Sequence, residues 1–314
     1  MPRTKRDEIH IISRNSNWSA TGVEKALKEE VYNGANSWKK FLKLLLVSLG
    51  VGFTVAGTVF FFAYNWTELP KFAKLGMVEV GVLITVLLFF VAKLNQELRN
   101  IVLTGAAVLV GVMFAVFGQI YQTGANAYDF FLGWTAFIAL WVLVANFPPL
   151  WLLFLTLCNT TFILYSEQVA FGWHPLLVMD ALVVFNSVSF IAFTWLSAKG
   201  KVKAPRWFTY IIAMVAVSIA TVCIVGGMFN KVEWQFMVSL LLTVAIYIGG
   251  AVYAFRQRNI FLLGLLALSL IVIISALIIK ADGEVGGFLT VTVFVTISVP
   301  IVIMKLIEFQ KTAK

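Results

Sequence analysis

The chain has 314 residues, of which 61% are hydrophobic and only 12% are charged. Soluble globular domains are about 45–50% apolar and about 25% charged, so this composition excludes a soluble enzyme. The net charge of +9 does not indicate nucleic-acid binding, because the basic residues lie mostly in the N-terminal segment and in short polar stretches between long apolar runs. The pattern is typical of an all-α polytopic integral membrane protein.

The first 40 residues are polar and are expected to lie in the cytoplasm. Thr21 is followed three residues later by Glu24, a capping-box spacing that predicts the start of a helix. Val23, Ala26, Leu27 and Val31 recur at helical spacing, which predicts a short amphipathic helix over about 21–33. Its apolar face would contact lipid headgroups, the membrane domain or a protein partner; a solvated lead-in to the first span is the alternative.

About ten transmembrane helices are predicted in the rest of the chain, and they form a transmembrane domain over 41–307 that is followed by a cytoplasmic tail, 308–314. Each apolar run approaches the roughly 20 residues that a helix needs to cross a bilayer. The predicted spans are 41–64, 72–92, 100–120, 128–145, 148–165, 175–197, 207–229, 233–254, 259–280 and 285–307. Asn146 and the prolines at 148 and 149 leave so short a connection that the fourth and fifth spans should form a tight antiparallel hairpin.

Basic residues predict the orientation of these spans. If both termini are cytoplasmic, 20 of the 24 Lys and Arg residues fall on the inner side. Ten spans also divide into two sets of five, and an odd-numbered repeat unit would place the two halves in opposite orientations, as in inverted-repeat transporters. The sequence therefore predicts N-in/C-in topology and allows a 5+5 inverted repeat.

Two stretches of the sequence resemble a known family. The first comprises residues 52–57 (Gly-Phe-Thr-Val-Ala-Gly), 61–66 (Phe-Phe-Ala-Tyr-Asn-Trp) and 69–76, and the second runs from 118–125 (Gly-Gln-Ile-Tyr-Gln-Thr-Gly-Ala) to Trp134. Together they resemble domain-of-unknown-function family 2157, predicted bacterial multi-pass membrane proteins, over about residues 19–165. The resemblance implies a location in the bacterial inner membrane and brings no established activity or site residues.

Two acidic residues stand out because they lie well inside predicted spans rather than at their ends. Glu79 lies about 12 Å along its helix from Lys71, near the middle of a hydrocarbon core about 30 Å thick, and Asp180 lies about 7–8 Å from Pro175. An ionisable group at such depth costs about 2.5–3.5 kcal/mol to insert, so each is a candidate proton, cation or substrate site. The alternative is structural, because a protonated acid can hydrogen-bond a neighbouring helix.

Further polar residues gather in the same half of the predicted membrane domain. Gln119 and Gln122 end the third span, Asp129 begins the fourth, and Asn159 lies in the middle of the fifth. They are compatible with a polar cavity. The alternatives are a helix end and loop for the glutamines and an N-terminal helix cap for Asp129.

Metal and cofactor chemistry finds little support in the sequence. The two histidines and the two cysteines, Cys158 and Cys223, are too far apart for a metal-binding motif, and the cysteines are expected to serve helix packing. No phosphate-binding loop or nucleophile elbow is present. We therefore expect no cofactor.

The leading hypothesis is a bacterial inner-membrane transporter-like protein that moves a small solute or ion, with a protonatable or cation site at Glu79 and Asp180 as its companion. The alternative is a non-catalytic scaffold or sensor subunit that binds a protein partner through the N-terminal helix. A third hypothesis is an intramembrane enzyme that acts on lipid. The sequence argues against it, because it shows no nucleophile paired with a base.

Overall fold

The computed structural model describes residues 6–28, 35–91, 93–121, 124, 126–230 and 233–311. The chain divides into two compact units, residues 1–121 and 122–314. Among the described residues, ten helices are long and apolar enough to cross a membrane, which confirms the predicted number of spans. Most of their ends lie within four residues of the predicted ones, but the first span starts at Ala35 rather than at 41.

The first unit begins with two short helices, α1 (Arg6–Arg14) and α2 (Ala20–Ala26). The sequence analysis did not predict α1. Helix α2 begins one residue before the predicted start, and its N-cap is Ser19 rather than Thr21: the Ser19 side chain accepts a hydrogen bond from the Gly22 amide at 3.1 Å. Serine is a better N-cap in this register than Thr21 because its hydroxyl reaches the amides of the first turn. Residues 29–33 of the predicted amphipathic helix lie outside the described residues, so that helix stays a prediction.

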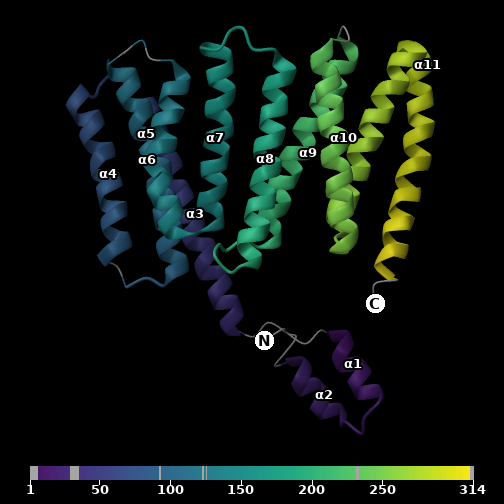
Figure 1. The fold of residues 1–314 in the computed structure, drawn as a ribbon. Helices are drawn as coiled ribbons and strands as arrows, with labels where there is room; N and C mark the ends of the chain where they lie inside the picture. Colours follow the sequence, from purple (N-terminus) through teal and green to yellow (C-terminus); the bar gives the residue numbers. More distant parts are fainter. Residues whose placement is uncertain are drawn as a thin grey trace. The chain divides into compact units, whose positions relative to one another are not determined.

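Three membrane-length helices complete the first unit: α3 (Ala35–Tyr64), α4 (Lys71–Val91) and α5 (Gln96–Tyr121). Helix α5 packs against both α3 and α4 and carries most of the buried residues of the three (Figure 1). At Gly105 a Cβ atom would lie only 2.4 Å from Val51 Cγ1, so this glycine permits the close approach of α3 and α5. The helix is buried at Ala107 and Gly111, whereas Gly118 faces open space.

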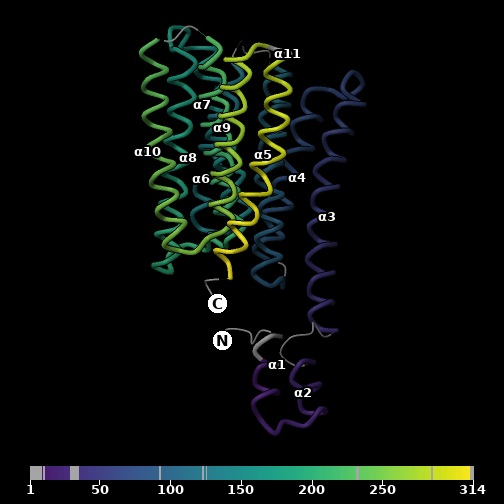
Figure 2. The backbone as a smooth tube through the Cα atoms, turned by 90° about the vertical axis from the view of Figure 1, so that its right-hand side faces the viewer, coloured from purple at the N-terminus to yellow at the C-terminus, as the bar shows by residue number. Residues whose placement is uncertain are grey.

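The described part of the second unit contains six helices: α6 (Ala127–Ala145), α7 (Pro148–Gln168), α8 (Pro175–Ala198), α9 (Arg206–Phe229), α10 (Trp234–Arg256) and α11 (Ile260–Lys311). They run lengthwise beside one another (Figure 2). Helix α9 contacts α7, α8, α10 and α11, and it carries the longest series of buried residues in this unit. The core of the second unit therefore lies around α9.

The connection between α6 and α7 is the tight hairpin that the sequence predicted. Asn146 ends α6 in the left-handed conformation with φ 44°, and Pro148 begins α7. The Asn146 side chain also joins the α8–α9 loop, because it donates to the Lys201 carbonyl and accepts from the Lys203 amide, both at 3.2 Å. The two helices pack along their lengths.

Helix α11 comprises two spans, Ile260–Gly283 and Gly286–Lys311, which meet at a break. Gly283 there has φ 75° and ψ 178°, a conformation that is essentially restricted to glycine. Gly287 follows the break, and a Cβ atom at this position would lie 2.8 Å from the Cα atom of Ile279. At the break, the backbone of Gly287 therefore packs closely against the backbone of Ile279.

Gly287→Val should lower the melting temperature of the purified protein because the added side chain meets backbone rather than a flexible side chain. Forcing extra atoms into such a contact costs about 1–3 kcal/mol. The matched control is Gly286→Val, where the nearest atom to an added Cβ lies 3.9 Å away. Thermal unfolding in detergent compares the two variants, and equal melting temperatures would contradict the predicted clash.

Candidate functional site

The candidate site lies around Asp180, where α8, α9 and α10 meet. The Asp180 side chain is buried, with 7% of the residue exposed, and each carboxylate oxygen accepts one hydrogen bond. Ser239 of α10 donates to Oδ2 at 2.8 Å, and the Cys223 thiol of α9 donates to Oδ1 at 3.7 Å. Ser239 is fully buried, and Cys223 is 1% exposed. An acidic group thus lies among three helices with a hydroxyl and a thiol as its partners.

The three residues meet because they lie at similar depths on antiparallel or adjacent helices. Asp180 is five residues beyond Pro175, and Ser239 is five residues beyond Trp234, which places both about 7–8 Å along their helices. Cys223 lies six residues before the end of α9 at Phe229. The sequence analysis missed Ser239 and assigned Cys223 to packing, although this match in depth was readable from the span ends.

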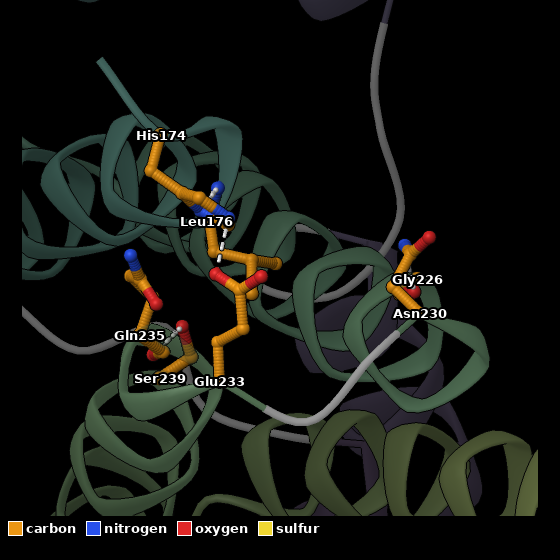
Figure 3. Close-up of polar contacts among 7 residues, drawn as sticks. All are labelled: His174, Leu176, Gly226, Asn230, Glu233, Gln235 and Ser239. Carbon is orange, nitrogen blue, oxygen red and sulfur yellow. Dashed lines mark hydrogen bonds and ion pairs between the residues drawn. The ribbon is translucent and has the colours of Figure 1, made fainter. Parts of the chain in front are cut away.

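His174 and Glu233 form a side-chain pair at the same end of these helices. His174 Nε2 lies 3.7 Å from Glu233 Oε2, and Figure 3 shows the ring and the carboxylate turned toward each other. His174 Nδ1 accepts a hydrogen bond from the Leu176 amide at 3.3 Å, so Nε2 carries the hydrogen that faces Glu233. In the same view Ser239 also donates to the Gln235 carbonyl, at 3.1 Å. Glu233 is the N-cap of α10, six residues and therefore about 9 Å along the helix before Ser239, whose hydroxyl contacts Asp180.

A hydroxyl cluster lies deeper along α10. Thr221 of α9, Tyr247 of α10 and Ser269 of α11 hydrogen-bond one another, with 2.6 Å between the Thr221 and Ser269 oxygens and 3.4 Å between the Thr221 and Tyr247 oxygens. Tyr247 and Ser269 are buried. On α10, the buried residues Ser239, Thr243 and Tyr247 follow one another at four-residue spacing, so they share one face of the helix. This face connects the Asp180 site to the hydroxyl cluster.

Asn159 has a different partner from Asp180. Its amide group pairs with that of Asn186 on α8: Asn186 Nδ2 donates to Asn159 Oδ1 at 2.7 Å, and Asn159 Nδ2 donates in return at 3.3 Å. Each amide also donates to a carbonyl one turn earlier in its own helix, Leu155 or Leu182. Asn159 therefore joins α7 to α8, and its hydrogen-bonding groups are already used within the protein.

Replacing Asn159 with leucine should destabilise the second unit by about 1–2 kcal/mol, because it leaves the buried Asn186 amide without its cross-helix partner. Asn186→Leu should cost a similar amount, and the double variant should cost less than the two single changes together. Thermal unfolding of the unmodified protein, the two single variants and the double variant measures the coupling energy between the two asparagines. Strictly additive effects would contradict the paired geometry.

The other predicted site residues that the structure describes lie on α4, α5 and α6. Glu79 is exposed on α4, in the first unit, and Gln119 is exposed near the end of α5. Gln122 lies outside the described residues. Asp129 is the third residue of α6, and its Oδ2 accepts a hydrogen bond from the Asn126 amide at 3.1 Å, which is the N-terminal cap that the sequence analysis gave as its alternative.

Lys74 is buried although it is a basic residue near the start of α4. The residue is 8% exposed, and its Nζ lies 3.9 Å from the centre of the Trp66 ring. A lysine can bury its aliphatic stem while its ammonium group rests on an aromatic face, which explains the burial without an acidic partner. Trp66 and Leu69 also pack, together with Ile120, against the buried cluster of Phe62, Val78 and Val116. The two stretches that carry the family resemblance therefore pack on the same cluster.

No group of three or more His, Cys, Asp or Glu residues that could hold a metal ion occurs within the described part of the chain. The two carboxylate oxygens of Asp180 accept hydrogen bonds from one hydroxyl and one thiol. This donor set suits a proton better than a transition metal, which prefers several nitrogen or sulfur ligands in one place.

The ten apolar helices and their buried polar contacts define a multi-pass helical membrane protein. Within that class, residues 19–151 match the model of a family described as "Predicted membrane protein (DUF2157)", which confirms the resemblance seen in the sequence for that part of the chain. No curated protein and no solved structure matches the chain. Asp180, Cys223 and Ser239 all lie beyond the matched residues.

Proposed function

We propose that this chain is a transporter-like protein of the bacterial inner membrane and that Asp180 is its proton-binding group. The observation that carries the proposal is the buried carboxyl group of Asp180, hydrogen-bonded to Ser239 and Cys223 between three membrane-length helices. Ionisable residues inside membrane spans are costly to insert and mark proton or ion pathways. Among the described residues, no lysine or arginine contacts this carboxyl group.

Beyond Asp180, further side-chain hydroxyl groups lie along the same face of α10. A proton taken up at the end of the helices marked by His174 and Glu233 would pass Ser239 to Asp180 and then follow Thr243 and Tyr247 toward Ser269. Hydroxyl groups suit such transfer because each can both donate and accept a hydrogen bond. The driven solute is a small molecule or ion.

Glu79 remains a second proposed proton or cation site. It lies eight residues beyond Lys71 on α4, on an exposed face of that helix, and the neighbouring Val80 and Leu83 are exposed apolar residues. A carboxyl group on such a face in the bilayer interior requires neutralisation or a covering partner. The comparison of Glu79→Gln with Asp180→Asn decides which acid serves transport.

Reconstitution of the protein in liposomes tests whether it moves protons across a membrane. Purified protein in liposomes with a trapped pH-sensitive dye should dissipate an imposed pH gradient faster than protein-free liposomes prepared in parallel. The gradient is imposed in both directions, since the orientation of the reconstituted protein is mixed. Proton flux equal to that of protein-free liposomes under both gradients would contradict a proton-transporting role.

We also propose N-in/C-in topology, on the distribution of basic residues. Single cysteines introduced at Lys201 and Arg258, both in loops of the second unit, should react with a membrane-impermeant thiol reagent only after the inner face is opened. A cysteine at Phe171 should react in intact cells. Cys158 and Cys223 are replaced by alanine in all three variants, and reversed labelling would contradict this orientation.

The second candidate function is a scaffold or sensor subunit that binds a protein partner through its N-terminal segment. Exposed apolar residues favour it: Ile11 and Ile12 of α1 and Trp18 before α2 face outward, and exposed apolar side chains of this size are suited to contacts. Deleting residues 1–36 should then abolish recovery of the partner after crosslinking while the membrane helices stay folded. Unchanged partner recovery would contradict this function.

A further inference from the structure

A cavity of about 460 Å³ lies on the second unit, between the end of α7, the start of α8 and the end of α9. Its rim carries Ser166, Glu167 and Trp173, and its inner wall is formed by apolar side chains that include Met179, Leu182 and Ile219. The volume falls within the range of about 300–1,000 Å³ that is typical of small-molecule sites. Asp180 does not line this cavity, so the cavity is separate from the proposed proton site.

The depth of the cavity matches one leaflet of a bilayer. Its deepest lining residues are Leu182, seven residues beyond Pro175 on α8, and Ser218, eleven residues before Phe229 on α9. At 1.5 Å per residue these positions lie about 10 Å and about 16 Å from the helix ends, and half of a hydrocarbon core is about 15 Å. A mostly apolar cavity of this depth suits one acyl chain better than a polar solute.

The charge at the rim of the cavity indicates which kind of lipid headgroup would bind there. Among the described residues that line the cavity, Glu167 is the one that carries a charge. Trp173 also lines the cavity, and its ring contacts those of Tyr165 and Phe162 with centroid distances of 5.8 and 5.9 Å. A carboxylate next to an aromatic face binds ammonium groups and disfavours anionic ones. The glutamate and the tryptophan together select for an amine.

We propose that this cavity binds a phospholipid of the surrounding leaflet, with one acyl chain between α8 and α9 and a primary ammonium headgroup at Glu167 and Trp173. The ligand class is therefore an aminophospholipid such as phosphatidylethanolamine. The proposal does not depend on transport by Asp180, because the two sites share no residue.

Native mass spectrometry of the delipidated protein, titrated with single lipids, tests this site. Phosphatidylethanolamine should bind about two- to fivefold more tightly than phosphatidylglycerol or N-acetylated phosphatidylethanolamine of the same chains, as expected for one partly exposed ion pair. Glu167→Gln should remove this preference. The matched control is Glu233→Gln, an acidic residue at the same helix ends but outside the cavity, and it should keep the preference.

A second variant tests whether the cavity holds the acyl chain of the lipid. Val222 lines the cavity and is 58% exposed, so Val222→Trp should fill the cavity without disturbing the core and should weaken binding of all three lipids. Equal affinities of the unmodified protein for the three lipids would overturn the headgroup assignment. Unchanged binding in Val222→Trp, or an equal loss of preference in Glu167→Gln and Glu233→Gln, would overturn the site itself.

Discussion

Asp180→Asn should reduce proton flux in proteoliposomes to the level of protein-free liposomes. Asparagine keeps the size of the side chain, and its amide oxygen can still accept the hydrogen bond from Ser239, so the helices should stay packed. What the variant loses is a group that binds and releases a proton. The flux is measured with the trapped dye, at equal amounts of reconstituted protein.

The matched control is Asp129→Asn, which removes a carboxylate from the same unit but from the cap of α6. The amide oxygen of asparagine can still accept the hydrogen bond from the Asn126 amide, so this variant should keep its stability and leave the flux unchanged. Flux that survives in Asp180→Asn would remove Asp180 from the proposed pathway. Flux that is lost in Glu79→Gln and kept in Asp180→Asn would move the site to α4.

Ser239→Ala should destabilise the second unit by about 1–3 kcal/mol, the cost of leaving a buried acceptor without its donor. Ser239 is fully buried and supplies the 2.8 Å hydrogen bond to Asp180 Oδ2, while alanine fits the same space without new contacts. The remaining donor, the Cys223 thiol at 3.7 Å, is weak. Thermal unfolding in detergent measures the change.

The control for this variant is Ser187→Ala. The Ser187 hydroxyl is buried on α8 and has no hydrogen-bond partner among the described residues, so its removal should leave the melting temperature nearly unchanged. In an Asp180→Leu background the effect of Ser239→Ala should also shrink, because the acceptor is already absent. If Ser239→Ala is as mild as Ser187→Ala, the hydrogen bond to Asp180 contributes little to stability.

The number of spans and the α6–α7 hairpin were predictable because they depend on local signals. Continuous apolar length predicts a span whatever its neighbours, and the asparagine and prolines at 146–149 leave room only for a tight turn. Asp129 was likewise readable as a cap, since it stands three residues after Asn126. Asp180 was recognised as a candidate because an acid in an apolar run is conspicuous.

The partners of these residues were not predictable in the same way. Cys223 and Ser239 lie 43 and 59 residues from Asp180, and membrane helices that are apolar on all sides give no stripe to show which face meets which neighbour. The same reason explains Asn159, which pairs with Asn186 rather than joining Asp180. The burial of Lys74 also depends on a residue outside its own helix, because the Trp66 ring covers its ammonium group.

Infrared difference spectroscopy between two pH values, in lipid, tests the central claim most directly, since it observes protonation of Asp180 itself. The account predicts a carbonyl-stretch band of a protonated carboxylic acid that changes with pH in the unmodified protein, persists in Glu79→Gln and is absent from Asp180→Asn. A spectrum in which Asp180→Asn keeps every pH-dependent carboxyl band would contradict the assignment of the proton site to Asp180.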